Sequence, residues 1–107
     1  MKAVKEIIDN IVEFLKDPQF QVEKIILFGS RAKKENKKFS DIDIAIVTKQ
    51  KLDIRTKRKI KDKIEELSGI YSVDLIFLEQ TSNEFKEIIK ETGITIYEKN
   101  RNNNSTK

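Results

Sequence analysis

The 107-residue sequence carries 22 basic and 18 acidic residues, giving a formal net charge of +4 at pH 7, and it contains neither cysteine nor histidine. Disulfides, thiolate zinc sites and imidazole bases or ligands are therefore excluded, and any metal chemistry has to use carboxylates. The length fits a single domain with one core. No apolar run is long enough to span a membrane, and the acidic Glu6 and Asp9 argue against an N-terminal signal peptide. We expect a cytoplasmic protein with no membrane association.

The first predicted element is an amphipathic helix that serves the core. Apolar side chains recur from Val4 to Leu15 at the spacing of one helical stripe, and Asp17-Pro18 ends the pattern. Residues 22–28 then form an apolar strand. This strand leads directly into a turn at Gly29.

The turn has the composition of a phosphate site. Free backbone N–H groups after Gly29, the Ser30 hydroxyl and the Arg31 guanidinium could hold phosphate oxygens at the start of a short helical turn. Each residue also has a simpler interpretation. Gly29 could serve only as a turn at a strand end, Ser30 only as a helix N-cap, and Arg31 only as a surface partner for a carboxylate.

A polar, lysine-rich loop at 32–40 precedes a second predicted strand at 41–47, which contains an Asp-x-Asp pair. Strand side chains alternate between faces, so Asp41 and Asp43 point the same way. The isoleucines between and after them (Ile42, Ile44, Ile46) point the other way, into a core. Two carboxylates this close repel one another unless a cation lies between them, and Mg²⁺ is the simplest candidate. An isolated Asp-x-Asp pair can also simply face water at a strand edge.

The next predicted element is a basic helix with Asp53 as its N-cap, which continues to Ser68 and stops at Gly69. Residues 49–63 contain eight basic and two acidic side chains. No aromatic residue interleaves this run as a base-stacking platform would require, so we expect a solvated helix face and no nucleic-acid binding. An acidic protein partner stays open.

A third carboxylate lies in the third predicted strand, at 72–78. Asp74 interrupts a run of apolar residues, and an unpaired carboxylate inside an apolar strand costs several kcal/mol, so it needs a partner, a cation or water.

The last predicted elements are a short helix and a short strand. The helix runs from Asn83 to about Glu91 and packs Phe85, Ile88 and Ile89, and the strand covers 94–97. The polar tail at 99–107 is expected to be disordered, which leaves one domain at 1–98. The order of elements predicts an α/β (α+β) fold, a small mixed sheet of about four strands with helices packed on it.

The spacing of these motifs resembles the nucleotidyltransferase superfamily that includes DNA polymerase beta. Its pattern is a Gly-Ser turn, about ten residues, Asp-x-Asp, and a further carboxylate on a later strand. Gly29-Ser30, Asp41-Ile42-Asp43 and Asp74 match that order. Two short motifs are most similar to those of the minimal nucleotidyltransferase (MNT) group. They are Phe-Gly-Ser-Arg-Ala from position 28 and Ser-Asp-Ile-Asp-Ile-Ala from position 40. The resemblance runs from about residue 7 to residue 97.

The resemblance implies the polymerase beta-like nucleotidyltransferase fold and a transfer reaction. Asp41, Asp43 and Asp74 would be the catalytic residues and would bind two Mg²⁺ ions, while Gly29, Ser30 and Arg31 would bind the phosphates of ATP. MNT proteins are largely antitoxins paired with HEPN-domain toxins. The implied reaction is therefore AMP transfer from ATP to a tyrosine of a HEPN ribonuclease toxin. This modification would inactivate the ribonuclease.

Two other functions stay open at this point. The chain could be a non-catalytic antitoxin that neutralises its partner by binding alone. It could also be a nucleotidyltransferase acting on a small molecule, although the helical domain that such enzymes add is missing from these 107 residues.

Overall fold

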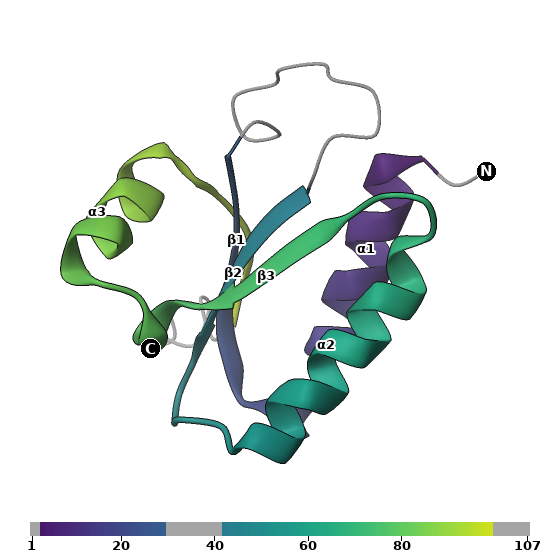
Figure 1. Cartoon of the computed structure of the whole chain (residues 1–107), viewed down its shortest axis with the longest axis horizontal. Helices are drawn as coiled ribbons and strands as arrows, with labels where there is room; N and C mark the ends of the chain where they lie inside the picture. The colour runs from purple at the N-terminus through teal and green to yellow at the C-terminus, as the bar shows by residue number, and fades with distance from the viewer. Residues whose placement is uncertain (1–2, 30–41, 100–107) are drawn as a thin grey trace, which may run out of the picture.

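The structure is a computed structural model that describes residues 3–29 and 42–99 (Figure 1). The helices and strands of the described part are α1 (Val4–Leu15), β1 (Val22–Phe28), β2 (Ile42–Thr48), α2 (Ile54–Ser68), β3 (Val73–Phe77), α3 (Asn83–Thr92) and β4 (Ile94–Glu98). Single 3-10 turns follow α1 and β3. None of the described helices combines the length and the apolar character that crossing a membrane requires.

The four strands form one mixed sheet in the order β3-β2-β1-β4. β1 pairs antiparallel with both β2 and β4, whereas β2 and β3 are parallel. A parallel pair needs a crossover connection, and α2 provides it. The predicted fold class, a small mixed sheet of four strands with helices packed on it, is confirmed.

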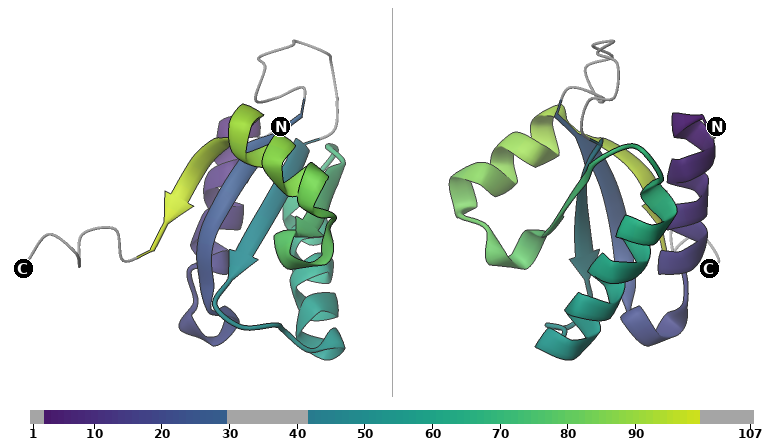
Figure 2. Two further views of the ribbon diagram at one scale, coloured as in Figure 1. Left: turned by 90° about the vertical axis from the view of Figure 1, so that its left-hand side faces the viewer. Right: turned by 45° about the vertical axis from the view of Figure 1, so that its right-hand side comes forward.

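The main core lies between the sheet and the helices α1 and α2, which cover the same face (Figures 1 and 2). Ile42, Ile44 and Ile46 all point into this core and are at most 1 % exposed. The alternation predicted for β2 is therefore correct. It turns the odd-numbered residues of β2, Asp43 among them, to the opposite face.

Helix α3 lies on that opposite face and covers it only in part (Figure 2). A small second core joins Ile26, Ala45, Leu78 and Ile89 there. The prediction that Ile88 also packs inside is wrong, because its side chain is 53 % exposed. A short helix lying on a sheet buries one narrow stripe, and in α3 that stripe passes through Ile89.

The element ends have identifiable causes. Asp53 caps α2 by accepting a hydrogen bond from the Thr56 N–H at 2.7 Å, and Gly69, with φ +64°, ends the helix. Ser82 caps α3 in the same way, accepting from the Phe85 N–H at 3.2 Å. β3 ends one residue earlier than predicted, at Phe77, because the chain turns there into a 3-10 helix.

Of the polar tail predicted to begin at residue 99, the structure describes only Lys99. Its N–H donates a hydrogen bond to the Glu23 carbonyl at 2.8 Å, which continues the pairing of β4 with β1. The rest of that tail lies outside the described residues.

Candidate active site

Two of the three predicted carboxylates lie side by side on neighbouring strands. Asp43 of β2 and Asp74 of β3 are partners in the parallel register, so both side chains project from the same face, the one that carries α3. Neighbouring strands are about 4.8 Å apart, which places the two carboxylates within reach of one cation. The crossover through α2 thus brings together two aspartates that are 31 positions apart in the sequence.

Asp74 is exposed, whereas the sequence placed it inside an apolar strand. The reason is topological. β3 is an edge strand, and Asp74 is its second residue, so its side chain meets solvent beyond the cover of α3. The carboxylate therefore pays little desolvation cost and needs no buried partner. It is accessible to a substrate or cation that arrives from solvent.

Gly29 touches the same group. Its backbone has φ +77°, the left-handed region that favours glycine, and a Cβ built there would collide with the carboxylate of Asp43, whose Cγ would lie 3.0 Å away. The turn after β1 is thus pressed directly against the carboxylate on β2. Backbone conformation and space both favour glycine here, beside one of the predicted site carboxylates.

The remaining predicted site residues, Ser30, Arg31 and Asp41, lie outside the described residues. Within 3–29 and 42–99, no group of three or more histidine, cysteine, aspartate or glutamate side chains gathers as a metal site. Of the three predicted metal ligands, the described part of the chain therefore contains two, Asp43 and Asp74. Both offer hard oxygen donors of the kind that Mg²⁺ prefers.

An aromatic pair borders these carboxylates, and sequence reasoning missed it. Phe28 is the register partner of Asp43 across β1 and β2, and its ring meets the ring of Phe85 edge to face, with centroids 6.0 Å apart. Phe85 comes from the first turn of α3. The signal available in the sequence was the position of Phe28 directly before the Gly-Ser turn, but nothing in the sequence connects it with Phe85.

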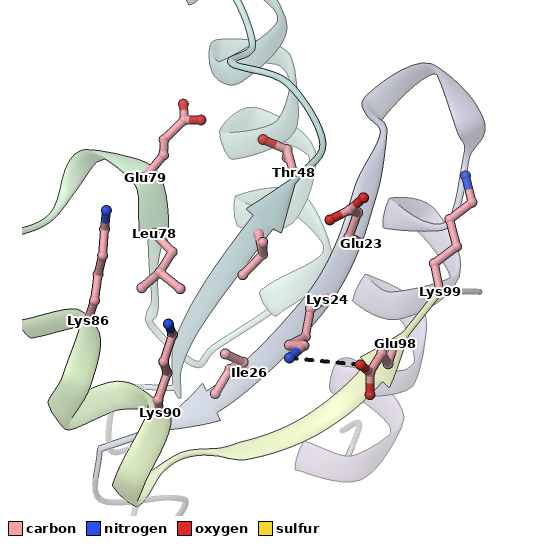
Figure 3. A pocket seen from close by; sticks show the side chains of 11 residues that line it. Glu23, Lys24, Ile26, Thr48, Leu78, Glu79, Lys86, Lys90, Glu98 and Lys99 are labelled. Carbon is pink, nitrogen blue, oxygen red and sulfur yellow. Dashed lines mark ion pairs between the residues drawn. The ribbon is translucent and has the colours of Figure 1, made fainter. Parts of the chain in front are cut away.

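A separate groove of about 880 Å³ lies on the same sheet face at the other end of the strands (Figure 3). Its rim is charged, with Lys86 and Lys90 of α3 on one side and an ion pair between Lys24 and Glu98, 3.8 Å apart, on the other. None of the predicted site residues lines it. The carboxylates and this groove are therefore distinct features of one face.

The basic helix is not uniformly solvated. The Lys57 side chain is only 12 % exposed. Its ammonium group lies 3.5 Å from the Glu79 carboxylate and 5.1 Å from the centre of the Phe77 ring. This residue ties α2 to the end of β3. Its role is packing within the chain, which removes it from the surface available to a partner.

Comparison with known proteins identifies the class. The family model described as "Polymerase beta, Nucleotidyltransferase" matches residues 9–102. The chain therefore belongs to the polymerase beta nucleotidyltransferase family. The carboxylate pair and the glycine turn derived above lie within the matched part.

Two relatives of the chain are described as protein adenylyltransferases. The chain is 38 % identical over 74 residues to the "Probable protein adenylyltransferase MntA" of Haemophilus influenzae, a match that covers 69 % of this chain and 65 % of that protein. It is 33 % identical over 97 residues to the "Putative protein adenylyltransferase MJ1217" of Methanocaldococcus jannaschii, covering 90 % of this chain and 97 % of the relative. The match thus spans slightly less than two thirds of the Haemophilus relative and almost all of the Methanocaldococcus relative.

Solved structures share the fold. A toxin-antitoxin complex with AMP-PNP superimposes with a TM-score of 0.73 at 24 % identity, covering 90 % of this chain and 77 % of that one. An MNT antitoxin in complex with the tri-AMPylated HEPN toxin of Shewanella oneidensis gives a TM-score of 0.69 at 22 % identity, covering 94 % of this chain and 76 % of that one. These similarities show that the arrangement of sheet and helices is that of the family.

Proposed function

We propose that this protein is a metal-dependent nucleotidyltransferase that moves AMP from ATP to a hydroxyl of a partner protein, a tyrosine of a HEPN ribonuclease toxin, and thereby acts as its antitoxin. The observation that carries the proposal is the arrangement of three residues: Asp43 and Asp74 are register partners on one face of the sheet, and Gly29 lies against Asp43. The named activity of the relatives and the family fold support it.

The residues present suit a triphosphate bound with Mg²⁺. Asp43 and Asp74 offer oxygen donors beside the turn whose main chain would face the β and γ phosphates. We propose that Asp41 completes this carboxylate set, and that Ser30 and Arg31 bind phosphate oxygens. When bound, two Mg²⁺ ions would neutralise charge on the phosphates and align the reacting groups.

The reaction needs a base, and histidine is absent from the sequence. In the proposed step the acceptor hydroxyl oxygen attacks the α-phosphorus of ATP and forms a new P–O bond, while the bond from that phosphorus to the α–β bridging oxygen breaks. Pyrophosphate leaves with the bonding electron pair. Asp74, exposed at the edge of the sheet, accepts the hydroxyl proton.

The test uses ATP labelled at the α-phosphate, the full chain, and the HEPN-domain protein encoded in the neighbouring reading frame. We expect little label without the partner and label on a partner tyrosine with it, and we expect Asp43→Asn to abolish the transfer. Neutralisation of the toxin without any label would instead support binding alone. Label on an added small molecule but not on the partner would support the small-molecule alternative.

A further inference from the structure

A second groove, of about 550 Å³, runs along the outer edge of β3 and contains a residue of the candidate site. Its floor and one wall are residues 72–75 of β3 and the turn before it, and its other wall is the C-terminal half of α2. The helix residues are Lys61, Ile64, Glu65 and Ser68. We call it the edge groove. Asp74 is among the residues that line it.

The edge of β3 offers main-chain hydrogen-bonding groups to this groove. The Ile42 N–H donates to the Ser72 carbonyl at 2.7 Å, so the main chain at Ser72 faces β2. Main-chain direction alternates along a strand, which turns the N–H and C=O groups of Val73 and Leu75 to the outer edge. No strand in the described part of the chain pairs with that edge, because β3 is the last strand of the sheet.

The register of the sheet specifies where an added strand would place its side chains. Phe28, Asp43 and Asp74 form one row across β1, β2 and β3, with all three side chains on the same face. A residue paired with the outer side of Asp74 would continue this row on the same face, one strand spacing of about 4.8 Å further on. Its side chain would lie directly beside the Asp74 carboxylate.

We propose that the partner protein docks by adding an extended segment to the outer edge of β3, in the edge groove, and that this pairing brings its acceptor hydroxyl beside Asp74. The inference rests on the proposed transfer to a protein hydroxyl, and it names the surface and the conformation that the acceptor uses. Strand addition provides affinity through main-chain hydrogen bonds and fixes the acceptor by register.

The walls of the groove suit such a segment. Ile70, in the turn between α2 and β3, is 56 % exposed at the groove and offers an apolar anchor. The charged side chains of its helix wall, Lys61 and Glu65, have opposite signs. This leaves recognition to the main chain and one apolar contact. The charged groove beside α3 contains no residue of the candidate site and cannot present a hydroxyl to Asp74 in this way.

The test uses two adjacent helix residues of the same type. Glu65 lines the edge groove, whereas Glu66 does not, and both side chains are exposed. Since the chain contains no cysteine, Glu65→Cys and Glu66→Cys each carry one unique thiol. Each variant is modified with a benzophenone maleimide and mixed with the neighbouring HEPN-domain protein and labelled ATP. Transfer is measured for each variant before and after modification, so that the effect of the label is separated from the effect of the substitution.

We expect the modified Glu65→Cys variant to lose transfer by about tenfold or more, a loss comparable to blocking an interface hot spot. Its affinity for ATP with Mg²⁺, measured by calorimetry, should be unchanged. On illumination it should cross-link to the partner peptide that carries the AMP acceptor. Modified Glu66→Cys should keep its activity. Equal activity of the two modified proteins, or a cross-link that joins two copies of this chain, would overturn the proposal.

A second pair of variants tests the same surface without a bulky label. Ile70→Asp should weaken partner binding by about tenfold. Ile88→Asp is the matched control, because Ile88 is 53 % exposed and lies on α3, away from the edge groove. The reverse order of effects would place the partner on α3 and contradict strand addition. Failure of the wild type to label the partner would instead count against the proposed function.

Discussion

A substitution of Gly29 has two effects, the backbone strain of a positive φ and a clash with the Asp43 carboxylate, and comparison with Gly69 distinguishes them. Gly69 has a similar φ, +64° against +77° at Gly29, but a Cβ at Gly69 would meet nothing within 4 Å. Alanine at either position is strained, because L side chains rarely adopt a positive φ. Only at Gly29 does it also displace a carboxylate of the candidate site.

We therefore predict that both substitutions lower the free energy of unfolding, and that Gly29→Ala abolishes AMP transfer, whereas Gly69→Ala, which displaces no carboxylate, lowers transfer far less. Urea denaturation and the labelled-ATP assay measure the two effects. Full activity of Gly29→Ala would show that the turn does not have to approach Asp43 this closely.

The carboxylates themselves give a second prediction at this scale. Asp43→Asn and Asp74→Asn should each lower transfer by about 100-fold or more, because each removes a charged oxygen ligand from the proposed metal site. The melting temperature should be unchanged or higher, since the two carboxylates are register neighbours and repel one another. Calorimetry should detect ATP binding by the wild type with Mg²⁺ and much weaker binding with EDTA. Equal affinity in both conditions would contradict the metal's role.

At the scale of single elements, the stabilisation that α2 receives from its N-cap depends on pH. The hydrogen bond between the Asp53 carboxylate and Thr56 lowers the pKa of Asp53 below its usual value. A lowered pKa in the folded state stabilises the protein above the unfolded pKa of about 3.9, and this contribution is lost as pH falls through the folded pKa.

We expect the melting temperature of the wild type to fall more steeply between about pH 5 and pH 2 than that of Asp53→Asn, which keeps a capping side chain but cannot titrate. Thermal unfolding followed by circular dichroism checks this. Parallel curves for the two proteins would mean that the cap contributes nothing to the pH dependence.

The attachment of α2 to β3 depends on Lys57, whose ammonium group pairs with Glu79 and lies over the Phe77 ring. Lys57→Ala should lower the free energy of unfolding by about 1 kcal/mol, from the lost cation–π contact and the packing of the side-chain stem. Lys59→Ala, two residues along the same helix, alters an exposed side chain and should change it by less than about 0.5 kcal/mol. Chemical denaturation of both variants separates the packed lysine from the solvated one.

At the scale of the whole molecule, the two faces of the sheet differ in how deeply they are covered. Ile44 lies fully buried in the core beneath α1 and α2, whereas Ile88 on α3 is 53 % exposed. Ile44→Ala should cost about 2–5 kcal/mol of stability, within the range for a buried isoleucine. Ile88→Ala should cost less than about 0.5 kcal/mol. A large loss at Ile88 in the isolated protein would show that α3 packs more closely than this structure has it.

The sequence predicted every helix and strand of the described part because each carries a local signal. Helical stripes, the cap at Asp53 and the alternation around Asp43 depend only on neighbouring residues. The order of motifs likewise predicted the family. The exposure of Ile88 was not predicted correctly, since burial depends on what covers a side chain rather than on its neighbours in the chain. For Asp74 the sequence left a partner, a cation or water open, and only the structure shows that this side chain is exposed.

By itself, then, the sequence determined the helices and strands and indicated the family, and it predicted Asp41, Asp43 and Asp74 as the carboxylates of the site. The tertiary structure decided that β3 is an edge strand, that Asp43 and Asp74 share one row of the sheet, and that Gly29 contacts one of them. The physical reason is that strand order and register arise from long-range pairing and from the crossover through α2. The alternation within β3 specifies on which face Asp74 lies, but only the neighbouring strands specify what lies beside it.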